Sequence, residues 1–268
     1  MAANDSASKA YVDYVSAAVP DEICSKSDDG QIDFSAAYEN INHFFKKFTV
    51  TDVILFQKAG RTERNKQSEA YSNLFKDGNP VRYLKGIEIE ADNENTLHSL
   101  IRKERPNADF LTVRSADEKI IRAAADSPDV DAIIPISNNP QKPAAGQINH
   151  IAAKIAAGRK TAFAFDIAPF LFVKGYRRSK LFADAAEMIP IIRKYHVPVL
   201  LFSGAGSVFE QRGPYELEAF GRLLGLTREE TAAAVSTLPA EILRERQKQK
   251  SGVRIMSGVE VLNENGNE

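Results

Sequence analysis

Two short stretches decide the fold class of this chain: Ile133-Ile134-Pro135-Ile136 and Val199-Leu200-Leu201-Phe202. Both are apolar along their whole length, which is typical of strands that are covered on both faces. Such strands occur mainly in parallel sheets, because the helical crossovers between parallel strands lie on the two faces of the sheet. The two stretches therefore predict an α/β protein.

Further apolar stretches of strand length alternate with helical patterns as far as residue 203, at a spacing of roughly 22 to 40 residues. About seven such units predict a TIM-like barrel with fewer than the usual eight strands. An open doubly wound sheet is the alternative, since both architectures share this alternation. The expected strands are Tyr11–Val15, Val53–Phe56, Leu84–Ile89, Asp109–Val113, Ala132–Ile136, Thr161–Ile167 and Val199–Ser203.

Apolar positions at helical spacing predict helices between most strands and extra C-terminal helices after the last one. Two helices open on capping boxes, Ser115–Glu118 and Thr227–Glu230. Pro190 lies inside a long helical pattern and should kink or split that helix. The expected helices are Ala36–Phe48, Ser115–Asp126, Ile148–Ala157, Lys180–Tyr195, Pro214–Leu224, Arg228–Val235 and Pro239–Gln249.

The length of 268 residues fits one large domain, and we expect a single barrel domain over residues 1–268. Residues 250–268 are expected to form a C-terminal arm, within which Val253–Leu262 fits either one extra strand or an extended segment. The polar segments Ser25–Asp33 and Gly60–Ser68 are expected to be loops.

The composition is that of a soluble globular protein, with 43% hydrophobic and 26% charged residues. Cys24 is the only cysteine, which excludes an internal disulfide and a cysteine-built zinc site. The sequence has neither an apolar signal core at its start nor an apolar run of membrane-spanning length, so we expect a cytoplasmic protein without a membrane partner. The net charge of −1 argues against a protein that coats nucleic acid by bulk electrostatics.

The ends of the predicted strands carry few reactive groups. Glu88 and Glu90 share one face of a strand and would suit a metal or acid–base pair, but a solvated face is the interpretation we favour. Asp166 ends an apolar strand, where a carboxylate needs a cation or backbone donors. The small-residue turn Ser203–Ser207 has the size to hold a phosphate but lacks the end of a P-loop motif.

Several segments together resemble one family, in order and in spacing. They are Val130–Ile134 (VDAII), Gly146–Ile151 (GQINHI), Ala164–Leu171 (AFDIAPFL), Tyr176–Leu181 (YRRSKL), Arg212–Glu216 (RGPYE), Phe220–Gly225 (FGRLLG) and Ser257–Val261 (SGVEV). This set is similar to the archaeal ribonuclease P protein component 3 family, the counterpart of the eukaryotic thirty-kilodalton RNase P protein. The resemblance is good from Asp131 to Arg246 and weaker before it.

The resemblance implies a distorted TIM-like barrel, related in fold to the polymerase-and-histidinol-phosphatase group. It also implies a protein subunit of the endoribonuclease RNase P, a hydrolase that removes the 5′ leader from precursor tRNA by RNA catalysis. The implied partners are the RNase P RNA and a small ferredoxin-like protein subunit, with pre-tRNA contacted indirectly. We expect no catalytic residue, metal or cofactor in the chain itself, and magnesium in the assembled enzyme.

The resemblance also implies an RNA-binding or functional surface, made of Asp131, His150, Arg159, Lys160, Arg178, Arg212 and Glu216. Two of these residues keep a structural alternative: His150 as a helix cap or core residue, and Arg212 as an ion-pair partner of Glu216. The loop Ser137–Pro143 departs from the family by lacking an arginine, which Lys142 would replace without the bidentate fork.

Two enzyme hypotheses stand beside the subunit. The first is a metal-dependent phosphoesterase on the related barrel, which needs several histidine and carboxylate ligands. The four histidines, His43, His98, His150 and His196, are far apart and form no His-x-His pair, which disfavours it. The second is an unrelated barrel enzyme that holds phosphate at Ser203–Ser207, which leaves the colinear segments unexplained.

Overall fold

The computed structural model describes residues 11–16, 34–60, 74, 80–137, 145–146, 148–251, 254–256 and 259–260. Cys24, the predicted loop Ser25–Asp33 and residues 61–68 of the second predicted loop lie outside these ranges, as does Lys142.

Seven parallel strands form one sheet whose spatial order follows the chain from β1 to β7. All seven predicted strands are confirmed, with ends shifted by at most a few residues. The register runs from Val12 opposite Asp52 at the first pair to Phe163 opposite Val199 at the last. The strands are β1 (Val12–Ser16), β2 (Asp52–Lys58), β3 (Arg82–Ile89), β4 (Phe110–Arg114), β5 (Ala132–Ile134), β6 (Ala162–Asp166) and β7 (Val199–Phe202).

The sheet closes on itself beyond the end of β7. Gly204 N donates to Tyr14 O at 3.0 Å, and Ser16 N donates to Ala205 O at 2.8 Å. These bonds join the segment after the last strand to the first strand. Closure and the sequential strand order decide for the barrel, since a doubly wound sheet starts from its middle and keeps two free edges.

The expected helices are confirmed, and the described ranges also contain α4 (Glu94–Glu104) and α7 (Ala168–Phe172), which were not predicted. The N-cap of α4 is Asn93, whose side chain accepts from Thr96 N at 2.9 Å. The other long helices are α2 (Phe34–Lys47), α5 (Glu118–Asp126), α6 (His150–Arg159), α8 (Tyr176–Lys194), α9 (Pro214–Leu223), α10 (Arg228–Val235) and α11 (Thr237–Lys250), and short 3-10 turns lie at η2 (Arg105–Asn107) and η3 (Val208–Glu210).

Two local predictions about helices need correction. The cap of α5 is Asp117, which accepts from the amides of Lys119 and Ile120, so the predicted box at Ser115 is wrong. The helix α8 is not split at Pro190 but runs on to Lys194, so of the two predicted outcomes the split is wrong, and the kink stays a prediction. The predicted capping box between Thr227 and Glu230 is confirmed.

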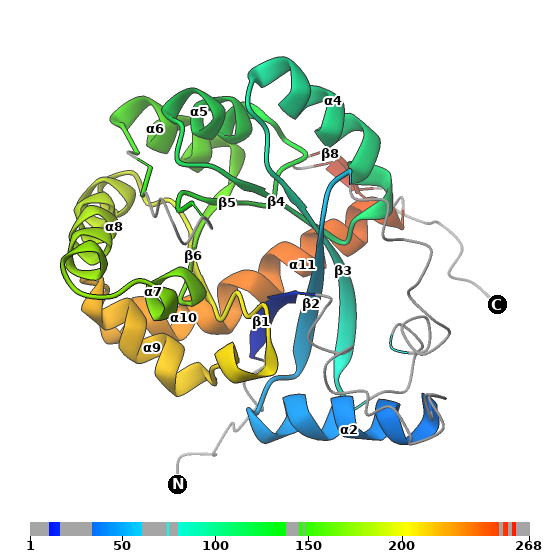
Figure 1. Ribbon diagram of the computed structural model, residues 1–268. Coiled ribbons are helices and arrows are strands. Elements are labelled where there is room, and N and C mark those ends of the chain that lie inside the picture. The colour runs from blue at the N-terminus through cyan, green and yellow to red at the C-terminus, as the bar shows by residue number, and fades with distance from the viewer. Residues whose placement is uncertain are drawn as a thin grey trace, which may run out of the picture.

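Side chains fill the barrel interior. The ring of Tyr14 stacks on Phe56 with 4.3 Å between ring centroids, and Phe110 and Phe202 pack beside it. Leu243 of α11 belongs to the same buried cluster. Figure 1 shows α11 crossing the barrel, with the other helices around the outside. The interior is therefore a core with α11 packed against it, and its polar groups need partners within the chain.

After α11, two short strands pair antiparallel in a separate sheet, β8 (Arg254–Met256) and β9 (Val259–Glu260). The sequence left open one extra strand or an extended segment here, and the described backbone instead forms a pair of strands. The assignment of residues 250–268 as an arm of a single domain stays a prediction.

Candidate functional site

The carboxyl ends of the strands, where barrel enzymes place their reactive groups, hold a buried arginine. Arg114, the last residue of β4, is 2% exposed in its side chain. Its Nε donates to Glu88 Oε2 at 3.0 Å, and its Nη2 donates to Asp166 Oδ2 at 2.6 Å. Its Nη1 also donates to the carbonyl of Ile136 at 3.2 Å. One guanidinium thus joins β3, β4 and β6 across the barrel.

Arg114 and its two carboxylate partners attract each other, whereas the two carboxylates repel each other. Burial raises the pKa of Glu88, and the cation of Arg114 opposes that rise. The two carboxylates raise the pKa of Arg114 against the effect of its own burial, so the guanidinium stays charged. Tyr14 adds its hydroxyl, 3.3 Å from Glu88 Oε2 and 2.6 Å from Thr112 Oγ1. Burial, followed by the charge of Glu88, raises the pKa of Tyr14 well above its usual value, so it serves as a neutral donor.

The carboxylates singled out from the sequence differ in burial and in their partners. Asp166 has the cation partner that the sequence required, and that prediction is confirmed. The preferred interpretation of Glu88 as part of a solvated face is wrong, because this side chain is buried inside the barrel. Glu90 is exposed and pairs with Lys58 at 2.7 Å. The signal that was missed is Arg114 itself, an arginine that directly follows four strand residues.

This arrangement does not offer the two carboxylates to a metal ion. The guanidinium of Arg114 lies between Glu88 and Asp166 and forms an ion pair with each of them. Within the described part of the chain, no group of three or more histidine, cysteine, aspartate or glutamate side chains could hold a metal ion. The chemistry at this end of the barrel is that of a structural ion-pair network.

The turn Ser203–Ser207 is bound by the chain's own carboxylates. Ser203 donates through its amide and its hydroxyl to Asp13, at 2.7 and 2.6 Å. Gly206 N donates to Glu210 at 2.8 Å, and Ser207 Oγ donates to the same carboxylate at 3.0 Å. These donors already have anionic partners, so the idea of a phosphate site at this turn loses its basis.

Asp131 lies at the start of β5 and is buried. Its Oδ2 accepts from Arg105 Nη1 at 2.7 Å and from Leu111 N at 2.7 Å, and its Oδ1 accepts from Arg246 Nε on α11. This predicted site residue therefore holds α11 to the barrel, and its carboxylate is not exposed. Lys250, the last residue of α11, makes a second ion pair between this helix and the barrel, with Asp109 at 2.5 Å.

Arg159 is the last residue of α6 and Lys160 is its C-cap, and both side chains are exposed. Arg159 pairs with Asp126 at 3.0 Å, and Lys160 takes a left-handed conformation at the C-cap, with φ of 60°. His150 is exposed at the other end of α6, where its ring lies 5.7 Å from that of Tyr195. The helix cap is Asn149, so the alternatives of a capping or core His150 do not hold.

Arg178 is half-buried in the first turn of α8, where its Nε donates to Val173 O at 2.6 Å and its Nη2 to Leu171 O at 3.2 Å. Arg212 precedes α9, and its Nη1 donates to the carbonyls of Phe209 and Gln211 at 3.0 and 2.7 Å.

The alternative of an Arg212–Glu216 pair finds no support among the described ion pairs. Glu216 is exposed in the first turn of α9. The seven predicted residues are thus distributed over different parts of the molecule. Asp131, Arg159 and Lys160 lie near the starts of β5 and β6, whereas the other four lie at the beginnings of α6, α8 and α9.

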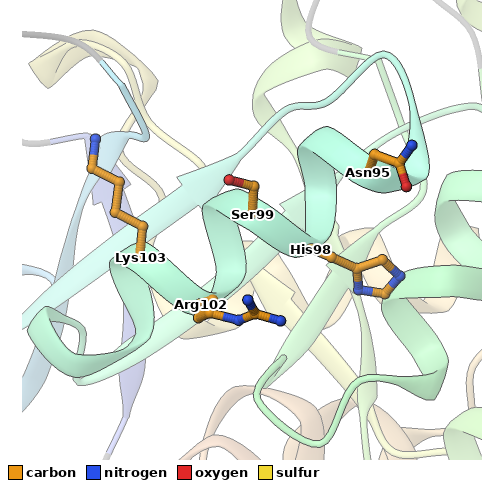
Figure 2. A pocket seen from close by; sticks show the side chains of 5 residues that line it. All are labelled: Asn95, His98, Ser99, Arg102 and Lys103. Atoms are coloured by element: carbon orange, nitrogen blue, oxygen red, sulfur yellow. The ribbon is translucent and has the colours of Figure 1, made fainter.

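Sequence reasoning also missed a polar face on α4. An open hollow of about 430 Å³ is lined by side chains that can all donate a hydrogen bond: Asn95, His98, Ser99, Arg102 and Lys103. Figure 2 shows that all five project from this one helix. The described lining has no acidic side chain, so it presents donors and cations to solvent. The signal was present in the sequence, but the helix itself was not predicted.

The chain matches the family model described as "RNase P subunit p30" over residues 33–251, which is most of its length. The chain belongs to the RNase P p30 family. Two relatives named "Ribonuclease P protein component 3" are each 35% identical to it. The relative from Methanosarcina mazei aligns over 67% of this chain and 72% of its own length, and that from Methanococcoides burtonii over 66% and 70%.

The fold is similar to that of a chain in a structure of archaeal ribonuclease P with mature tRNA. The match has a TM-score of 0.71 and 18% identity, and it covers 96% of this chain and all of the other. For this p30-family member the comparison therefore supports the same barrel. Among the described helices, none combines the length and apolarity needed to cross a membrane.

Proposed function

We propose that this chain is a non-catalytic, RNA-binding protein subunit of ribonuclease P, which supports removal of the 5′ leader from precursor tRNA by the RNA subunit. The observation that carries the non-catalytic role is Arg114, which forms ion pairs with both Glu88 and Asp166 at the end of the barrel where an enzyme would keep reactive groups free. Membership of the p30 family supports the assembly to which the chain contributes.

The same observation disfavours a metal-dependent phosphoesterase. That chemistry needs carboxylates and histidines that are free to bind metal. Here both interior carboxylates are paired with Arg114, and the exposed His98 and His150 lie on the outer helices α4 and α6. Magnesium is assigned to the assembled RNA–protein enzyme rather than to this chain.

RNA would be bound by the outer surface, because the interior is filled. The α4 face defined by Asn95, His98, Ser99, Arg102 and Lys103 suits phosphate and sugar groups, which are contacted by these types of side chain. Arg159 and Lys160 provide cations at a second place. Other surfaces remain for the proposed partner, a small ferredoxin-like protein subunit, and we place the complex in the cytoplasm.

Reconstitution tests the proposal. Pre-tRNA cleavage is measured with the RNase P RNA, the small subunit and magnesium, with and without this chain. We expect this chain to increase cleavage and, when purified free of RNA, to cut nothing on its own. Cleavage by the chain alone, or tight zinc or manganese binding with phosphatase turnover, would contradict the proposal. Unchanged cleavage when the chain is added would contradict it equally.

A further inference from the structure

The connection between α7 and α8 exposes aromatic side chains that the fold does not use. Phe172 is 48% exposed and Tyr176 is 82% exposed. Their neighbours in the same connection are buried: Val173 packs in the core, and Phe170 packs against Phe182 and Phe220. We call residues 172–177 the α7–α8 corner.

The corner carries positive charge without an acidic neighbour in the sequence. From Ala168 to Ala183 the chain has four cations, Lys174, Arg177, Arg178 and Lys180, and no aspartate or glutamate. Lys174 and Arg177 are exposed. The next acidic residue along the chain, Asp184, forms an ion pair with Lys180 at 2.8 Å. A negatively charged partner is therefore favoured over a neutral or cationic one.

Arg178 fixes the shape of the corner. Its guanidinium bonds to the carbonyls of Leu171 and Val173, and its backbone amide donates to Gly175 O at 3.0 Å. Gly175 has a φ of 59°, a conformation that glycine adopts without strain. These hydrogen bonds fix the backbone before and after Gly175. The ring of Tyr176 can therefore bind a partner with little loss of conformational entropy.

We propose that the α7–α8 corner binds an unpaired stretch of RNA, with a base stacked on Tyr176 and phosphates contacted by Lys174 and Arg177. This inference rests on the proposed function and names the kind of RNA that the subunit would recognise. Exposed aromatic rings between cations suit unpaired nucleotides, because every base has a face that can stack. Tyrosine, phenylalanine and arginine are also enriched in protein interfaces, whereas lysine is depleted there, so Lys174 is the side chain that favours RNA over a protein partner.

The test measures binding of the full-length chain to a labelled single-stranded RNA of mixed sequence across a salt series. Tyr176→Ala should weaken binding roughly tenfold, in the range known for one stacked base. Its salt dependence should stay unchanged, because no charge is lost. Tyr176→Phe keeps the ring and should bind like the parent chain. The double variant Lys174→Ala/Arg177→Ala should lower the slope of log K against log salt by about 1.4, for two phosphates on a single strand.

Leu223→Ala is the control, since it removes another exposed apolar side chain, at the end of α9. It should leave RNA binding unchanged. If Tyr176→Ala binds single-stranded RNA like the parent, the corner is not an RNA site, whereas reconstituted cleavage by both chains would leave the proposed function intact. If Tyr176→Ala loses only its binding to the small protein subunit, the corner is a protein interface and the inference is overturned. If the parent chain binds RNase P RNA in no condition and adds nothing to cleavage, the proposed function itself fails.

Discussion

Arg246 on α11 donates a hydrogen bond to Asp131 at the start of β5, 115 positions earlier in the chain. The same carboxylate accepts from Arg105 and from the amide of Leu111, so it connects α11, the end of α4 and two strands. Removing one partner from such a buried cluster costs more than breaking an exposed pair, because it leaves charges without compensation inside the chain. The helix packed against the barrel interior is thus fastened by a charge cluster in addition to Leu243.

The first prediction concerns this cluster. Asp131→Ala should lower the free energy of unfolding by about 3 kcal/mol, because the change leaves two partly buried arginines and one amide without their acceptor. Thermal and urea unfolding measure the loss. Asp126→Ala is the control: its side chain is 65% exposed, and its pair with Arg159 should contribute less than about 1 kcal/mol. An Asp131→Ala chain as stable as the Asp126→Ala control would refute this structural role.

The second prediction concerns pH and Arg114. Arg114→Met should cost about 3–5 kcal/mol near neutral pH, since Glu88 and Asp166 would be left buried and unpaired. The pKa of Glu88 in the folded chain, already raised by burial, should rise further without the cation. The folded state then binds more protons than the unfolded state, so stability should recover as the pH falls through the folded pKa of Glu88 toward its unfolded value.

Urea unfolding of Arg114→Met at several pH values measures this recovery. The matched control is the triple variant Glu88→Gln/Arg114→Met/Asp166→Asn, which should be more stable at neutral pH than the single variant and should lack its recovery at low pH. A single variant that loses further stability on acidification would refute the assignment of these charges.

The third prediction concerns Gly204, where the barrel closes. This residue has a φ of 59°, and a Cβ placed there would lie 2.5 Å from the side chain of Asp166. Gly204→Ala should therefore destabilise the chain by more than about 1 kcal/mol, through backbone strain and displacement of Asp166 from Arg114. Gly158→Ala in α6 is the control, because its Cβ would meet nothing within 4 Å. That change should be neutral or stabilise the helix by up to about 1 kcal/mol. Equal melting temperatures for the two variants would contradict the prediction.

The fourth prediction concerns Arg159 and Lys160. The variants Arg159→Ala and Lys160→Gly should each reduce the salt slope of binding to RNase P RNA by roughly one unit, if each cation contacts one phosphate. Glycine is chosen for Lys160 because it suits the φ of 60° at the C-cap of α6. The melting temperature should change little, since both side chains are exposed. Arg193→Ala, which removes an exposed arginine paired with Glu230, should leave the slope unchanged. A loss of stability with an unchanged slope would make Arg159 and Lys160 structural.

The strands and most helices were predictable because their signals are local. An apolar run such as Val199–Phe202 shows its burial within its own residues, and so does the capping box at Thr227. The helix α4 was not predicted because it has few apolar positions: Leu97 and Ile101 are buried, and most of their neighbours in the sequence are polar. The family resemblance also depended on local segments in order along the chain, and it led to the p30 family that the comparisons show.

The sequence by itself thus determined the α/β alternation, the seven strands and the family. The tertiary structure decided the barrel closure between Tyr14 and Gly204 and the partners of buried charges such as Glu88 and Asp131. Glu88 and Arg114 are 26 residues apart in neighbouring strands, and Asp131 and Arg246 are 115 apart. Periodicity tells which face of a strand is apolar, but it does not tell which side chain of another strand will lie opposite. Burial of a carboxylate such as Glu88 or Asp131 depends on such an opposite charge, because the free energy needed to remove an unpaired ion from water exceeds the free energy gained by packing around it.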